Sequence, residues 1–168
     1  MKRGFTLVEL IVSIVIVSLI SGGAMVYLNR FNSRQKLEKT KDEVVTSIKL
    51  AQSYAKGRQL PSNSAEPELK YVKLELNGNF VTAYANEDAA TSYFSKTVNN
   101  SETLVSFSES PIFFWSGSGR LAKNGTDEFY GENETEKVTV SYSAEETERY
   151  EIIINAMGQI KEINYYEN

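Results

Sequence analysis

One carboxylate in the N-terminal part of the chain is set apart by its surroundings. Glu9 is the only residue charged at neutral pH in an apolar run that extends from residue 5 to residue 28. A carboxylate in a membrane-spanning segment costs up to about 3 kcal/mol at the centre of the helix and less near its end. Because a nearby cation favours the charged form of such a group, the sequence predicts a positively charged partner for Glu9.

No set of residues in the chain predicts catalysis. The chain has no cysteine and no histidine, which excludes a thiolate site, a histidine-based triad and a zinc site of the usual type. It also has no P-loop, no G-x-S-x-G elbow and no dinucleotide-binding glycine motif. A calcium site is the one metal alternative, and its candidate ligands lack an ordered spacing: Asp127, Glu128, Glu132 and Glu134. We therefore predict a protein that is not an enzyme and that has no cofactor and no metal.

The apolar run itself is long enough to cross a membrane. Its 24 residues span about 36 Å as a helix. A secretory signal peptide is a poor alternative, because its apolar region would be shorter and a cleavage site with small residues would follow it. A plain signal anchor is the second alternative, but it leaves Glu9 unexplained.

The residues around the start of this run carry a resemblance. Lys2 and Arg3 precede the sequence Gly4-Phe5-Thr6-Leu7-Val8-Glu9, which resembles the cleavage and methylation signal of type IV prepilins and of the pseudopilins of type II secretion. The resemblance implies that a prepilin peptidase cuts between Gly4 and Phe5 and that the new amino group of Phe5 is methylated. It also implies that Glu9, the fifth residue of the mature chain, faces the N-terminal amine of a neighbouring subunit in a filament.

After the apolar run, an amphipathic helix is predicted for residues 29–59. One apolar face recurs at spacings of seven, four, three and four residues: Leu37, Val44, Ile48, Ala51 and Ala55. Gly57 and Pro61 supply the stop, so the helix should run from Thr6 to about Lys56. Gly22 and Gly23 weaken the helix by about 1 kcal/mol each relative to alanine, and they are either a hinge or a site of close helix packing.

The rest of the chain, residues 60–168, is predicted to be rich in β-strands. Residues 71–76 and 79–84 flank Asn77-Gly78 and predict a hairpin with a type I′ turn. Residues 86–100 are either a loop or a ragged edge strand. Further strands are expected at residues 104–107, 112–115, 138–142, 150–155 and 159–165, with a polar loop at residues 123–136. One long helix followed by about seven strands predicts an α+β fold with an antiparallel sheet, a pilin-like arrangement.

The sequence thus predicts four parts: a leader (residues 1–4), a transmembrane helix (5–28), an amphipathic helix (29–59) and a β-rich domain (60–168). The length of the chain fits this division. Of the 168 residues, 18 are basic and 22 acidic, giving a net charge of −4, and removal of Lys2 and Arg3 would leave 16 basic residues and a net charge of −6. An acidic chain argues against general affinity for nucleic acid. Five basic residues follow the apolar run, and by the positive-inside rule alone they would place the C-terminal domain in the cytoplasm: Arg30, Arg34, Lys36, Lys39 and Lys41. The resemblance implies the opposite orientation, with the domain outside the cytoplasm.

Three later segments, around residues 46–61, 112–125 and 148–163, are similar in order to the H-type minor pseudopilins and related minor pilins. The predicted function is therefore a structural, minor subunit of a type IV pilus-like or type II secretion filament, held first in the cytoplasmic membrane. The implied partners are the prepilin peptidase, other pilin subunits and an inner-membrane assembly platform. Two alternatives stay open: a membrane-anchored domain without a filament, and a competence pilin that binds DNA through Arg58, Lys70, Lys73, Arg120 and Lys123.

Overall fold

The computed structural model describes residues 6–62, 64, 66–87, 91–98, 102–142 and 148–167. The chain divides into two compact units, residues 1–36 and residues 37–168. A single helix, α1 (Leu7–Lys56), contains 50 residues and contributes to both units. The predicted helix from Thr6 to about Lys56 is therefore confirmed to within one residue.

The part of α1 that belongs to the second unit has one buried face. The five apolar residues that recur along this part of the sequence, Leu37, Val44, Ile48, Ala51 and Ala55, are all at most 1% exposed. Two small polar residues, Thr40 and Ser47, are buried on the helix as well. The Ser47 hydroxyl donates to the Glu43 carbonyl at 2.8 Å, so its burial leaves no unpaired donor.

The first sheet has five strands in the order β3-β2-β1-β5-β6. Its strands are β1 (Tyr71–Asn77), β2 (Phe80–Ala85), β3 (Ser92–Thr97), β5 (Ile112–Trp115) and β6 (Leu121–Ala122). Every pairing in it is antiparallel. Because β3 lies at the edge, the edge-strand interpretation of residues 86–100 is confirmed for Ser92–Thr97.

The second sheet has four antiparallel strands in the order β4-β7-β8-β9. Its strands are β4 (Thr103–Phe107), β7 (Thr135–Tyr142), β8 (Glu148–Asn155) and β9 (Ile160–Glu167). The inward residues of β7 and β8, such as Val138, Val140 and Ile152, are fully buried.

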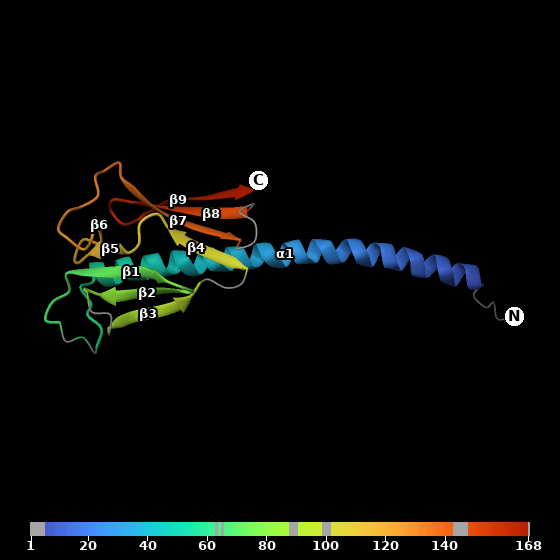
Figure 1. Ribbon diagram of the computed structural model, residues 1–168, viewed down its shortest axis with the longest axis horizontal. Helices are drawn as coiled ribbons and strands as arrows, with labels where there is room; N and C mark the ends of the chain where they lie inside the picture. Colours follow the sequence, from blue (N-terminus) through green and yellow to red (C-terminus); the bar gives the residue numbers. More distant parts are fainter. Residues whose placement is uncertain are drawn as a thin grey trace. The chain divides into compact units, whose positions relative to one another are not determined.

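In Figure 1, strands β2 and β3 of the first sheet and strands β7, β8 and β9 of the second lie on opposite sides of the C-terminal part of α1, and side chains of α1 contact both sheets. Tyr54 stacks on Tyr93 of β3 with ring centroids 4.5 Å apart. On the other sheet, the hydroxyl oxygens of Thr40 and Thr103 lie 3.3 Å apart at the start of β4. The helix therefore shares one hydrophobic core with both sheets, which is the α+β, pilin-like arrangement predicted from the sequence.

Two details of the β-region differ from the prediction. There are two sheets where one was expected, because β4 leaves the first sheet and β5 returns to it, a crossover that local alternation does not reveal. The first hairpin turn is centred on Gly78-Asn79, since Asn77 pairs with Phe80. Of these two central residues only Gly78 has a positive φ, 58°, which fits a type II′ turn and not the type I′ turn predicted.

Candidate processing and assembly site

The start of α1 is capped by Thr6. The backbone N–H of Glu9 donates to the Thr6 hydroxyl at 3.3 Å, and this hydroxyl lies 3.5 Å from the Glu9 carboxylate. A threonine followed three residues later by a glutamate is the sequence pattern of a capping box, so this role of Thr6 could have been read from the sequence. Gly4 and Phe5, the predicted cleavage and methylation residues, lie outside the described residues.

The described apolar side chains that follow the cap are exposed in the isolated chain. Leu7, Leu19 and Ile20 are each at least 67% exposed. The helix contains a stretch that is long and apolar enough to span a membrane, and none of that stretch is buried. So large an exposed apolar surface fits membrane anchoring and, in a filament, contact with other subunits.

The polar side chains of this stretch differ in how well they are satisfied. The hydroxyls of Ser13 and Ser18 donate to the carbonyls four residues earlier, at 2.7 and 2.8 Å, so they need no partner outside the helix. The Glu9 carboxylate has only the Thr6 hydroxyl at 3.5 Å among the residues described in this unit. Unlike the two serine hydroxyls, the Glu9 carboxylate could therefore still bind a cation from outside the helix.

The predicted hinge at Gly22 and Gly23 lies within unbroken helix. Apart from the backbone of the helix itself, no atom comes within 4 Å of a Cβ built at either position. Both glycines therefore leave room for close approach of another helix, and the choice between a hinge and a packing site stays a prediction.

The C-terminal end of α1 is held by two glycine turns of the β-region. The Gln52 amide Nε2 donates to the carbonyls of Met157, at 2.9 Å, and of Gly119, at 3.3 Å. Gly158 has φ +74°, and a Cβ there would lie 2.2 Å from the Gly119 carbonyl oxygen. Gly117 and Gly119, in the turn before Arg120, also have positive φ.

A buried carboxylate in the second sheet was missed by the sequence interpretation. Glu136 is 2% exposed, and its Oε1 accepts hydrogen bonds from the Ser108 hydroxyl at 2.6 Å and from the Glu109 N–H at 2.7 Å. The loop predicted for residues 123–136 ends earlier, because β7 begins at Thr135. Extending the alternation of Val138 and Val140 back by two residues would have placed Glu136 on the inward face.

Tyr130 joins Glu136 to a second carboxylate at a charged hollow. Its hydroxyl lies 2.9 Å from a Glu109 oxygen and 3.2 Å from a Glu136 oxygen, and burial together with these carboxylates raises its pKa. The hollow, of about 380 Å³, is lined partly by Glu109, Lys123 and Glu134. Lys123 pairs with Glu134 at 2.9 Å, and the Gly131 N–H and Lys123 lower the pKa of the Glu134 carboxyl. In this hollow, Lys123 and Glu134 thus pair with each other, while the Glu109 carboxylate accepts a hydrogen bond from Tyr130.

The positions of the described side chains do not support two alternatives from the sequence analysis, a calcium site and DNA binding. Among the described residues, no group of three or more acidic side chains is placed to hold a metal ion. Of the basic residues considered for DNA, Lys73 pairs with Glu75 at 3.3 Å and Lys123 with Glu134. Arg120 lies over the ring of Phe129, 4.6 Å from its centroid.

Comparison with known proteins supports the N-terminal signal. Residues 1–25 match the family described as the prokaryotic N-terminal methylation motif. No curated protein and no solved structure matches the chain. The chain therefore carries a type IV prepilin-like signal, on a long helix that packs against antiparallel sheets. This motif marks structural proteins that a prepilin peptidase processes and that assemble with other pilin subunits.

Proposed function

We propose that this protein is a minor structural subunit of a type IV pilus-like or type II secretion filament. The observation that carries the proposal is the methylation motif at residues 1–25, placed at the start of a helix whose apolar side chains are exposed. An exposed apolar helix is stable in a lipid bilayer, and in a filament it would bury the same surface against other subunits. The H-type minor pseudopilins are the group whose sequence pattern the chain resembles.

Two successive segments of the chain have different roles in this proposal. Residues 5–28 store the subunit in the cytoplasmic membrane and later form the filament core. Residues 29–59 attach this core to the β-domain, which lies outside the cytoplasm and supplies contacts or display. The orientation follows from the peptidase, which acts on the cytoplasmic side where Gly4 would then lie.

Glu9 supplies the assembly contact. Its carboxylate accepts no close hydrogen bond from a described side chain, the nearest being Thr6 at 3.5 Å. The methylated amine of Phe5 in a neighbouring subunit is a cation of matching size, and in a low-dielectric filament core the attraction would be much stronger than in water. Assembly would thus offset the cost of burying each charge.

Processing by a prepilin peptidase tests the proposal. Co-expression with the peptidase should remove residues 1–4 and add one methyl group to the new N-terminus, both measured as intact mass. Gly4→Val should block removal, because the peptidase site is expected to accept only a small residue before the cut. Gly22→Val is the control: it makes the same substitution at a position with open space around it, within the same apolar segment, and it should be processed normally. Normal removal of residues 1–4 from Gly4→Val would contradict the proposal.

A further inference from the structure

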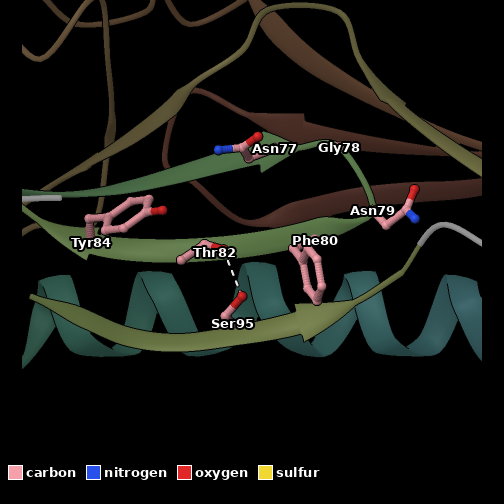
Figure 2. Close-up of a pocket in the computed structure, with 7 residues that line it drawn as sticks. All are labelled: Asn77, Gly78, Asn79, Phe80, Thr82, Tyr84 and Ser95. Carbon is pink, nitrogen blue, oxygen red and sulfur yellow. Dashed lines mark hydrogen bonds between the residues drawn. The ribbon is translucent and has the colours of Figure 1, made fainter. Parts of the chain in front are cut away.

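A shallow hollow of about 410 Å³ lies on the outward face of the first sheet (Figure 2). The turn between β1 and β2 contributes Asn77, Gly78 and Asn79 to its lining. Strand β2 contributes two aromatic residues, and the edge strand β3 contributes Ser95. The hollow lies within residues 77–95 and is therefore independent of the N-terminal signal.

The floor and walls of the hollow have different chemistry. Phe80, Thr82 and Tyr84 alternate with the buried residues of β2, so all three belong to the outward face. Thr82 is only 6% exposed, and its hydroxyl lies 2.9 Å from that of Ser95. Figure 2 shows this hydroxyl pair between the rings of Phe80 and Tyr84. The hollow therefore has a polar floor between two aromatic walls.

The Phe80 wall is open to a ligand, whereas the Tyr84 wall is partly buried. Phe80 is 48% exposed, although most of its neighbours on the outward face are polar. Lys73 lies over the ring of Tyr84, 5.4 Å from its centroid, and orients that ring from the side of β1. An exposed aromatic residue beside a hollow is a more informative signal than a singly exposed aliphatic residue, because aromatic rings contribute large contact areas in recognition.

The lining of the hollow is electrically neutral. None of its seven residues is charged, whereas 24% of the chain consists of charged residues. The nearest described charges on β1, Lys73 and Glu75, pair with each other at 3.3 Å. By contrast, the hollow described above around Glu109, Lys123 and Glu134 is lined by charged residues. A neutral ligand with both apolar and hydrogen-bonding faces is thus favoured at the first hollow.

We infer that this hollow binds a neutral oligosaccharide. The C–H faces of a sugar ring pack against aromatic rings, and its hydroxyls both donate and accept hydrogen bonds. Asn77, Asn79, Thr82 and Ser95 offer donors and acceptors in a matching mixture. A proline-rich peptide would also pack on the rings, but its prolines have no N–H and can only accept hydrogen bonds, whereas this lining offers both donors and acceptors.

Saturation-transfer NMR with the full chain tests this inference. The protein would be kept in a zwitterionic detergent without a sugar headgroup, so that the detergent does not compete. The probes are three neutral tetrasaccharides (chitotetraose, cellotetraose and maltotetraose), with decaproline and polygalacturonate as competing classes. At least one tetrasaccharide should receive saturation at its ring C–H protons, while decaproline and polygalacturonate should not.

Variants assign the binding to the hollow. Phe80→Ala and Tyr84→Ala should each weaken binding about tenfold, and Phe80→Trp should retain it. Thr82→Val keeps the shape of the floor but removes its hydroxyl, so it should also weaken binding. Tyr166→Ala removes a similarly exposed aromatic residue from β9 and should leave binding unchanged.

Three results would overturn the inference. One is the absence of saturation transfer to all three tetrasaccharides at millimolar concentration. A second is transfer to decaproline or polygalacturonate alone. The third is saccharide binding that persists at full strength in Phe80→Ala and Tyr84→Ala, with folding of each variant verified by its thermal unfolding.

Discussion

The carbonyl oxygen of Gly119 occupies the place that a side chain at Gly158 would need. A Cβ built on Gly158 would lie 2.2 Å from this oxygen, and the Gln52 amide donates to the same carbonyl at 3.3 Å. Three parts of the second unit therefore meet here: the end of α1, the turn before β6 and the turn between β8 and β9. The close approach explains why the chain has a glycine at position 158.

Gly158→Ala should strongly destabilise the β-domain. An alanine at φ +74° carries a strain of about 1–2 kcal/mol, and its Cβ also overlaps backbone that cannot rotate away. We expect the free energy of unfolding to fall by more than about 2 kcal/mol. Urea unfolding followed by the fluorescence of the single tryptophan, Trp115, measures this change.

Gly78→Ala is the matched control for the Gly158 prediction. Gly78 also has a positive φ, 58°, but no atom lies within 4 Å of its Cβ position. The free energy of unfolding of Gly78→Ala should fall only by the backbone strain of about 1–2 kcal/mol. Equal losses at the two positions would show that the approach of Gly119 to Gly158 is not a constraint on the fold.

Tyr93 should make stability depend on alkaline pH. Its ring stacks on Tyr54, its hydroxyl donates to the Gln59 carbonyl, and burial raises its pKa to about 12. The folded protein thus holds the proton more tightly than the unfolded chain, whose tyrosine pKa is about 10. The stabilisation is fully present below pH 10 and is lost as the pH rises from 10 to 12.

Tyr93→Phe isolates this contribution. The variant should lose about 1 kcal/mol at neutral pH with the hydrogen bond, but it should be less sensitive to pH above 10. The difference between the wild-type protein and the variant, measured by urea unfolding from pH 8 to pH 11.5, should therefore shrink. A difference that stays constant over this range would contradict the assignment.

A fragment of residues 29–168 should fold without detergent. The continuous exposed apolar stretch of α1 ends near Leu28, Phe31 is the one large exposed apolar residue that follows it on the helix, and the buried face begins at Leu37. We therefore propose that the membrane part and the soluble part divide near residue 29. Circular dichroism should show both helix and strand, and the fragment should be monodisperse in buffer. Extraction only with detergent would place the boundary elsewhere.

The sequence predicted those helices and strands in which apolar residues repeat at regular spacing within the element itself. The apolar face from Leu37 to Ala55 and the alternation of Val138 and Val140 both correspond to buried residues. The crossover of β4 into a second sheet was not predictable, because strand partners are chosen by contacts between distant segments. The turn at Gly78-Asn79 was misplaced by one residue, since the pairing of Asn77 with Phe80 decides the centre of the turn.

The candidate site was predicted from residue types and not from contacts. The position of Glu9 within an apolar run was sufficient to predict an unusual carboxylate. Its neighbour Thr6 was overlooked, although the spacing of the two residues indicates a cap. Thr6→Ala is for this reason a useful control, because it removes the cap, at a cost of about 1 kcal/mol to the helix, but leaves the carboxylate in place.

Filament incorporation of Glu9 variants is the most direct test of the proposed assembly role. Glu9→Leu makes the segment more apolar, so membrane insertion and removal of residues 1–4 should persist. A neighbouring N-terminal ammonium would then be buried without a partner, at a cost of about 3–5 kcal/mol. The measurement is the amount of processed subunit in sheared filaments relative to the membrane fraction. We predict a strong loss for Glu9→Leu, an intermediate value for Glu9→Gln and nearly wild-type incorporation for Thr6→Ala, whereas wild-type incorporation of Glu9→Leu would contradict the account.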